Sequence, residues 1–157
     1  MQLTRQTDYA VRVLMFLGIQ KSDELVTISD IAQHFDISRN HLMKIVHKLG
    51  QMDYIQTVRG KYGGLRLERE AQTINLGQVI RDFETSLDIV NCNKLYCPLT
   101  GACELKPILA RAREAFLQVV DEYTLQDLLR NPQDMRVLLN LDASFDEVLP
   151  LQIMDAS

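Results

Sequence analysis

The order of the hydrophobic patterns restricts the fold of this chain more than any other feature. Residues 5–20 and 28–35 place apolar side chains at the i, i+3, i+4, i+7 spacing of a helix that buries one face. A third stripe of the same spacing covers residues 42–49. Residues 54–58 instead alternate and are rich in β-forming residues, and residues 65–67 return as a second strand after a glycine-rich turn. Three helices followed by a hairpin are therefore predicted.

Two of these helices are marked by their own capping residues. Thr27 is followed three residues later by Asp30, as in a capping box, and Ser38 is a good N-cap for the third helix. Asp36 and Ile37 leave room for a tight turn between the second and third helices. Helix, helix, tight turn, helix and hairpin is the order of a winged helix-turn-helix. We therefore expect a mainly α fold with a small β-hairpin.

The second half of the chain is predicted to be helical on either side of an irregular segment. An apolar stripe over residues 76–83 predicts one helix, and residues 86–103 follow no helical or strand period. Residues 105–123 predict a long helix, in which Pro107 is tolerable because it falls in the first turn.

Shorter elements are expected after the long helix. Thr124 and Asp127 form a second capping box, which starts a short helix that ends before Pro132. Residues 135–141 predict one or two further helical turns. Residues 142–157 have no strong period, so we expect a flexible tail there.

Charge is divided unevenly along the chain. Residues 1–75 carry ten Lys and Arg against eight Asp and Glu, whereas residues 76–157 carry seven against thirteen. The first half can therefore face phosphate while the second half keeps the molecule soluble. We expect a DNA-binding domain over residues 1–75, a second functional region over residues 76–141, and the tail beyond it.

No segment predicts a membrane or a secretory route. No apolar run approaches the roughly 18 residues needed to span a bilayer. The first residues turn polar and acidic at Asp8, unlike the apolar core of a signal peptide. The expected compartment is the cytoplasm, and no membrane partner is expected.

The outward face of the third helix and the hairpin tip are rich in groups that bind DNA. In the major groove Arg pairs with guanine edges and Asn with adenine edges, and a helix N-terminus suits a phosphate. A basic hairpin tip can contact the backbone or enter the minor groove. Each cation taken singly is as typical of a solvated surface, but their combination on these two elements favours DNA binding. The predicted contacts are Thr27, Ser38, Arg39, Asn40, His41, Lys44, Lys48, Arg59, Lys61 and Tyr62.

Three competing motifs fail on their spacing. The turn at 60–64 precedes a strand and lacks the form of a phosphate-binding loop. His34, His41 and His47 are not spaced to stack on one helix face as metal ligands do. Ser38 with His41 resembles a nucleophile with its base, but an N-cap explains Ser38 better. We therefore expect no enzyme.

Three cysteines lie together in the irregular segment. Cys92, Cys97 and Cys103 follow a C-x4-C-x5-C pattern in a polar loop, where Pro98 and Gly101 supply the bends. Thiolates this close can converge on one centre, and they are the preferred ligands of iron–sulfur clusters. Zinc with a fourth ligand, a redox disulfide with a spare thiol, and buried structural cysteines remain alternatives.

When the cysteine loop is considered together with the predicted winged helix-turn-helix, the chain resembles the Rrf2 family of iron–sulfur winged-helix transcription regulators. The matching stretches are MQLT at 1–4 with TDY at 7–9, SRNHLMKI at 38–45, VRGKYGGLRL at 58–67 and the cysteine loop. The resemblance runs from residue 1 to about residue 140. The pairing of this wing with this cysteine loop is specific to the family.

The resemblance implies a homodimer with the helix at 104–123 as the subunit contact, and an iron–sulfur cluster, either [2Fe-2S] or [4Fe-4S], held by Cys92, Cys97 and Cys103. The x4 gap resembles the nitric-oxide-sensing branch rather than the iron-status or cluster-assembly sensors. In that branch an acid on the first helix of the opposite subunit can be the fourth ligand, and Asp8 occupies this place. The helix macrodipole alone also favours an acid there.

These implications combine into a ligand-switched repressor. The intact cluster would hold the cysteine loop against the DNA-binding head, across the dimer through Asp8, and nitric oxide at the iron would lower DNA affinity. The order of the elements motivates this expectation, because the loop lies between the head and the dimer helix in the sequence. An iron or iron–sulfur-status regulator of the same family is one alternative. A redox module is the alternative from another class.

Overall fold

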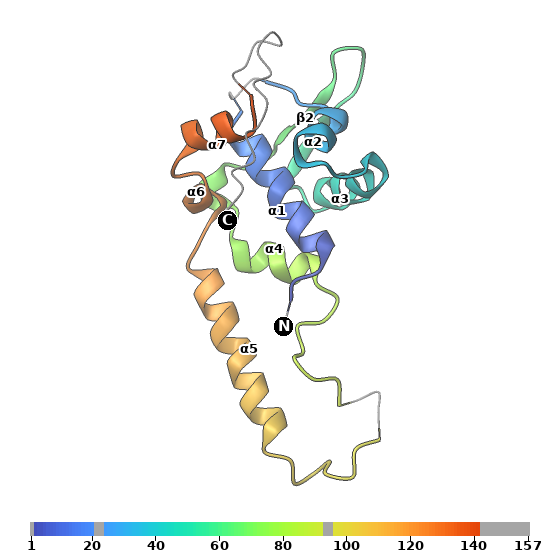
Figure 1. Cartoon of the computed structure of the whole chain (residues 1–157), viewed down its shortest axis with the longest axis vertical. Helices are drawn as coiled ribbons and strands as arrows, with labels where there is room; N and C mark the ends of the chain where they lie inside the picture. Colours follow the sequence, from blue (N-terminus) through green and yellow to red (C-terminus); the bar gives the residue numbers. More distant parts are fainter. Residues whose placement is uncertain (1, 21–23, 93–95, 142–157) are drawn as a thin grey trace, which may run out of the picture.

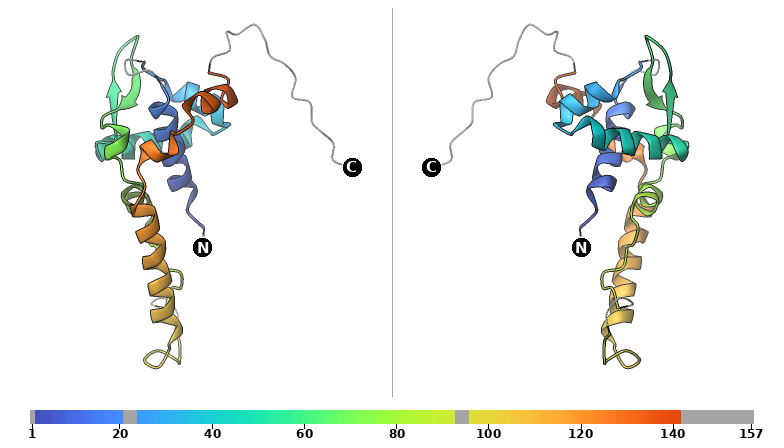
Figure 2. Two further views of the ribbon diagram at one scale, coloured as in Figure 1. Left: turned by 90° about the vertical axis from the view of Figure 1, so that its left-hand side faces the viewer. Right: turned by 90° about the vertical axis from the view of Figure 1, so that its right-hand side faces the viewer.

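The computed structural model describes residues 2–20, 24–92 and 96–141. The tail expected over residues 142–157 lies outside the described residues. The described part consists of a head, made of α1 to α4, the β-hairpin, α6 and α7, and a stalk, α5, that projects from it (Figure 1). The two side views show the stalk extending well beyond the head (Figure 2).

The three predicted N-terminal helices are present. They are α1 (Arg5–Gly18), α2 (Ile28–Phe35) and α3 (Arg39–Gln51). Thr27 and Asp30 form the expected capping box, and the Ser38 hydroxyl accepts from the backbone N–H of His41. Asp36 ends α2 in the left-handed conformation (φ 51°), which Asp tolerates better than most residues. These local signals therefore determine where α2 ends and α3 begins.

The predicted wing is an antiparallel hairpin of β1 (Ile55–Val58) and β2 (Gly64–Leu67), in the register Ile55↔Leu67 and Val58↔Gly64. An isolated bridge from Val26 to Leu65, which the sequence did not predict, ties the base of the wing to the segment before α2. Gly63 is required by close approach, because a Cβ there would meet the Val58 carbonyl oxygen at 2.1 Å.

α1 is the central helix of the head, since it packs against α3, α4, β2 and α6. The apolar positions predicted for α3 all face this core, as do those of α1. The buried apolar residues of α1, α2 and α3 are Ala10, Val13, Leu14, Phe16, Leu17, Ile31, Leu42, Ile45, Val46 and Leu49.

In the second half of the chain, the main difference from the predicted elements is where the last helix begins. The other elements are a 3-10 turn η1 (Ala71–Thr73), α4 (Leu76–Phe83), α5 (Leu105–Asp121), α6 (Leu125–Leu128) and α7 (Pro132–Leu138). A helix was expected from Met135, but α7 begins at Pro132. Proline is favoured at the first helical position, where its missing N–H has no helical partner, so Pro132 starts one helix as well as ending the previous one.

The irregular segment is called the arm and comprises residues 84–104, of which the structure describes 84–92 and 96–104. It leaves the end of α4, and its described parts run to the end of α5 that is far from the wing (Figure 1). Within the chain, therefore, the described part of the cysteine loop lies at the far end of the stalk rather than against the reading helix. The cysteines follow the head in sequence but lie far from it in space, because the arm leads the chain away from the head to the start of α5, and α5 then returns to the head. Every helix among the described residues is too short or too polar to cross a bilayer.

Candidate DNA-reading surface and cysteine cavity

The N-terminal half of α3 presents a polar, cationic face. Ser38, Arg39, Asn40, His41 and Lys44 are all exposed, while the buried residues of the helix point into the core. Thr27 is exposed at the start of α2. This arrangement leaves Arg and Asn side chains free to meet base edges, as a recognition helix requires.

Lys48 has surroundings that distinguish it from the other predicted contacts. Its Nζ lies 4.5 Å from the centroid of the buried Phe83 ring in α4, and the residue is half-buried. Such a cation–π contact holds the ammonium against the head. Lys48 therefore links α3 to α4 in addition to any contact with DNA.

The wing tip carries Arg59, Lys61 and Tyr62, and all three are exposed. Tyr62 is 85% exposed, and the Lys61 Nζ lies 5.6 Å from its ring centroid. Gly60 adopts a positive φ of 118°, which lets the tip reverse direction. The tip thus presents two cations and an aromatic ring to the solvent.

The three cysteines share one cavity at the end of α5. Cys92, Cys97 and Cys103 are free thiols of intermediate exposure, and together with Lys106 and Pro107 they line a cavity of about 210 Å³. Among the described residues, no three His, Cys, Asp or Glu are already close enough to hold a metal ion together. The thiols therefore line a common space without forming a preassembled ligand set.

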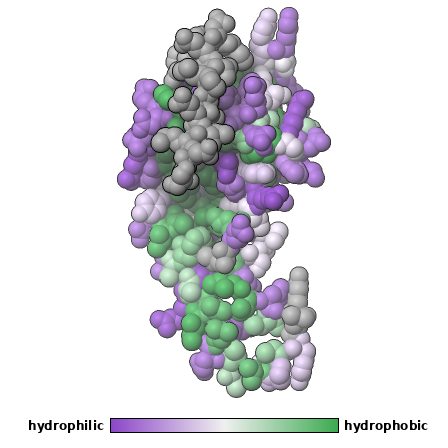
Figure 3. All heavy atoms as spheres, viewed as in Figure 1, coloured by the Kyte–Doolittle hydropathy of each residue, from purple (hydrophilic) through white to green (hydrophobic). Residues whose placement is uncertain are grey.

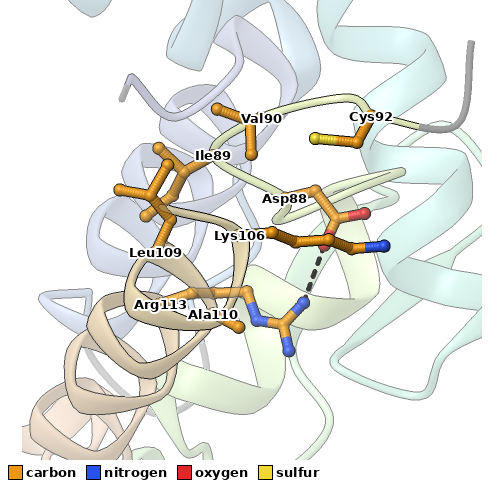
Figure 4. Close-up of a pocket in the computed structure, with 8 residues that line it drawn as sticks. All are labelled: Asp88, Ile89, Val90, Cys92, Lys106, Leu109, Ala110 and Arg113. Atoms are coloured by element: carbon orange, nitrogen blue, oxygen red, sulfur yellow. Dashed lines mark hydrogen bonds and ion pairs between the residues drawn. The ribbon is translucent and has the colours of Figure 1, made fainter. Parts of the chain in front are cut away.

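A second cavity lies beside the first and contains the contact that holds the arm on α5. It measures about 260 Å³, and Figure 4 shows Cys92 and Lys106 at its edge. Asp88 of the arm accepts a hydrogen bond of 2.7 Å from the Arg113 guanidinium of α5. Ile89 is half-buried in the lining of the same cavity. The arm is therefore fastened to the stalk just before Cys92.

Asp8 lies in the first turn of α1, in the head. Its Oδ1 accepts a hydrogen bond of 3.0 Å from the Arg12 Nε, and the Asp8 side chain remains 47% exposed. The start of α5, whose Lys106 and Pro107 line the cysteine cavity, is the end of the stalk that is far from the head (Figure 1). The Asp8 carboxylate is therefore partly exposed and far from the cysteines of its own chain.

The sequence did not predict the two contacts that anchor the arm before Cys92. Asp88 and Arg113 are 25 residues apart, and Glu84 contacts Thr7 across 77 residues. No periodicity or local motif signals pairs so distant in sequence. Of the histidines considered as metal ligands, His34 instead packs its ring 5.3 Å from that of Phe16.

An exposed cationic reading helix and a basic wing on a winged helix-turn-helix define a DNA-binding transcription regulator. The chain belongs to the Rrf2 family of iron-dependent transcriptional regulators, whose sequence profile matches residues 3–131. The predicted fold and the predicted family are both confirmed.

Similar proteins agree with this assignment. The HTH-type transcriptional regulator NsrR of Bacillus licheniformis is 46% identical over 143 residues, which cover 89% of this chain and 100% of that protein. NsrR of Geobacillus kaustophilus is 47% identical over 88% of this chain and 97% of its own length. CymR, the global cysteine regulator of B. subtilis, superposes with a TM-score of 0.67 at 25% identity over 82% of this chain and 95% of CymR.

Proposed function

We propose that this protein is an iron–sulfur-dependent, DNA-binding repressor that responds to nitric oxide. The observation that carries the proposal is the single cavity lined by all three free cysteines, in a member of a family of iron-dependent regulators. The C-x4-C spacing, which resembles the nitric-oxide-sensing branch of the family, and the similarity to the transcriptional regulator NsrR favour that signal.

The donor set fits a cluster. Cys92, Cys97 and Cys103 supply soft thiolate ligands, and three thiols serve a [2Fe-2S] or a [4Fe-4S] centre equally well. Asp8 of a partner subunit is the proposed fourth ligand, which its exposure permits. When bound, the cluster would supply iron that reacts with nitric oxide. The three cysteines line the cavity that would take the cluster, and the Asp88–Arg113 pair fixes the arm on the stalk.

The stalk supports a homodimer. Leu105, Ile108, Ala112, Ala115 and Val119 recur at a three–four spacing along α5, and all five are exposed. This is the a/d seam of a coiled coil, and its central alanines allow close approach of a second helix. On the face drawn in Figure 3, hydrophobic residues also gather along the stalk, whereas the visible part of the head is mostly hydrophilic.

The residues predicted to contact DNA on α3 and the wing are also part of this proposal. Arg39 and Asn40 on α3 read base edges, while Lys61 on the wing meets the phosphate backbone. We assign residues 1–75 to DNA reading and residues 76–141 to cluster binding and dimerisation. A dimer would present two reading helices about one helical turn of DNA (~34 Å) apart.

The test begins with anaerobic purification. We expect a coloured protein with bound iron that loses colour intensity and affinity for its target duplex on exposure to nitric oxide. Visible and Mössbauer spectra identify the centre, and gel shifts with a duplex selected from a random pool by the anaerobic protein report affinity. A Cys97→Ser variant should bind little iron and show no nitric oxide response.

The second candidate, an iron-status regulator, draws support from the family description. It predicts that iron limitation, but not nitric oxide, changes DNA affinity. An iron-free anaerobic dimer with full affinity would refute both candidates.

A further inference from the structure

The arm is held at two points before it reaches the cysteines. Asp88 pairs with Arg113 on the stalk, as described above. Glu84, the residue that follows α4, instead contacts the first turn of α1 in the head. The two acidic residues therefore connect one segment to two different parts of the molecule.

Three hydrogen-bond donors meet at one carboxylate oxygen of Glu84. Its Oε1 accepts hydrogen bonds from the backbone N–H of Thr4 at 2.7 Å, from the Thr4 hydroxyl at 3.1 Å, and from the Thr7 hydroxyl. Thr4 is itself the N-cap of α1. A carboxylate at a helix N-terminus is favoured by the macrodipole and satisfies N–H groups that lack helical partners.

Thr7 makes the contact sensitive to displacement of Glu84. The side chain is fully buried, at 0% exposure, and its hydroxyl donates to the Glu84 carboxylate. If Glu84 moved away, this hydroxyl could not turn to water, and among the described contacts it would keep the Thr4 hydroxyl, 3.3 Å away, in place of a carboxylate. Loss of a charged acceptor from a buried donor is costly, so the first turn of α1 should move with Glu84 or loosen.

α1 connects this turn to the DNA-reading surface. It packs directly against α3, and its buried Ala10 and Val13 belong to the same core as Leu42 of α3. Closely packed helices shift as units because their interiors leave little space for independent adjustment. A change at the start of α1 therefore reaches the reading helix.

We propose that Glu84 is the positioning residue that transmits the state of the cysteine arm to the reading helix, through Thr4 and Thr7. The inference rests on the proposed function, since it supposes that the arm changes between two states. It assigns separate roles to the two anchors: Asp88 holds the cysteines in place, and Glu84 communicates with the head.

The test uses two variants that break the link in different ways. Glu84→Ala removes the acceptor, whereas Thr7→Val removes the buried hydroxyl with little change of shape, so that the core stays filled. Asp127→Ala is the matched control, because it removes the carboxylate of the α6 capping box without touching the arm. Asp88→Ala tests the other anchor.

Three quantities are measured on each full-length dimer: iron per chain, melting temperature, and the ratio of operator affinities of the loaded and the iron-free protein. An allosteric ratio is typically about 5- to 150-fold. Glu84→Ala and Thr7→Val should retain iron while the ratio falls toward one. Asp127→Ala should lower the melting temperature yet keep the parental ratio, and Asp88→Ala should lower the iron content.

Hydrogen exchange gives a readout independent of DNA. In the parent protein the amides of residues 7–12 should exchange at different rates in the loaded and iron-free forms, and this difference should vanish in Glu84→Ala. A parental ratio in both link variants overturns the inference, as does loss of iron from Glu84→Ala, which would place Glu84 at the cavity. A parent with a ratio of one refutes the proposed function itself.

Discussion

Lys61 and Lys48 are both predicted DNA contacts, but their surroundings give them different roles. Lys61 is exposed at the wing tip, where only the ring of Tyr62 lies near its Nζ among the contacts described. Lys48 is half-buried with its Nζ over the Phe83 ring. An exposed ammonium releases counterions when it meets phosphate, whereas a cation over a buried ring also contributes to packing.

Lys61→Ala should therefore weaken binding to all duplexes by a similar factor. The slope of log affinity against log salt concentration should become shallower by about one. Gel shifts or fluorescence titrations over a salt series measure this slope. Lys48→Ala is the contrast, because it should also lower the melting temperature. An unchanged affinity and slope in Lys61→Ala would exclude the wing from DNA contact.

Tyr54 is a buried aromatic residue whose hydroxyl connects the start of the wing to α4. It is 1% exposed, and its hydroxyl donates to the Asp82 carboxylate at 2.5 Å. Burial, followed by the hydrogen bond to Asp82, raises the pKa of Tyr54 well above its ordinary value. Tyr54→Phe should cost about 1 kcal/mol of unfolding free energy, since it removes one partly buried hydrogen bond.

The raised pKa of Tyr54 also predicts a pH dependence. In the unfolded chain a tyrosine loses its proton near pH 10, while folded Tyr54 keeps its proton to higher pH. Above pH 10 the unfolded state therefore binds fewer protons, and stability falls as pH rises. Urea unfolding between pH 9 and 11 should show a smaller decrease for Tyr54→Phe than for the parent. Equal decreases would contradict this assignment.

At the scale of elements, the junction of α4 and α5 determines how the stalk leaves the head. The Arg81 guanidinium donates to both carboxylate oxygens of Asp121 at 2.6 Å, and the Asn75 amide donates to the Asp121 carbonyl oxygen at 2.7 Å. The pair with Arg81 lowers the pKa of Asp121. Gly77 faces this pair, since a Cβ there would meet the Asp121 Oδ1 at 1.8 Å.

Gly77→Ala should consequently displace the Asp121 carboxylate and break the bidentate pair. Because Gly77 is buried between the helices, the added methyl group should cost about 1–3 kcal/mol of unfolding free energy. Asp121→Asn should cost less, since an exposed ion pair contributes little. Denaturant unfolding of both variants measures the difference, and a Gly77→Ala protein as stable as its parent would show that the junction can adapt.

At the scale of the whole molecule, the stalk exposes more apolar surface than a lone helix should. Leu105, Ile108 and Val119 are each 56% exposed, and Leu117 alone is buried within the stalk helix as described. An exposed apolar seam of regular spacing is typical of a helix that meets a partner.

Ile108→Glu should convert the dimer to a monomer, because it places a charge within the apolar seam. Sedimentation velocity measures the change, and operator affinity should fall because two half-sites are no longer bound together. Leu138→Glu is the control, since Leu138 is also exposed (82%) but lies on α7. A parent that sediments as a monomer would contradict the proposed assembly.

The sequence alone determined the elements whose signals are local. Capping boxes, apolar stripes and the glycine turn predicted α1 to α4, the wing and α5, because backbone geometry and the burial of one face depend on residues a few positions apart. The cysteine set could be proposed in the same way, since its three members are close in the chain. The start of α7 at Pro132 was missed because proline suits both the end and the beginning of a helix.

Tertiary structure decided the relations between distant residues. It placed the cysteines at the far end of the stalk, Lys48 over Phe83, and Glu84 against Thr7. None of these follows from spacing, because a contact across many residues depends on how whole helices pack rather than on the pattern within any one of them. The cysteines proposed to bind the signal could therefore be predicted from the sequence, whereas the contact between Glu84 and Thr7, on which the proposed route to DNA rests, required the folded structure.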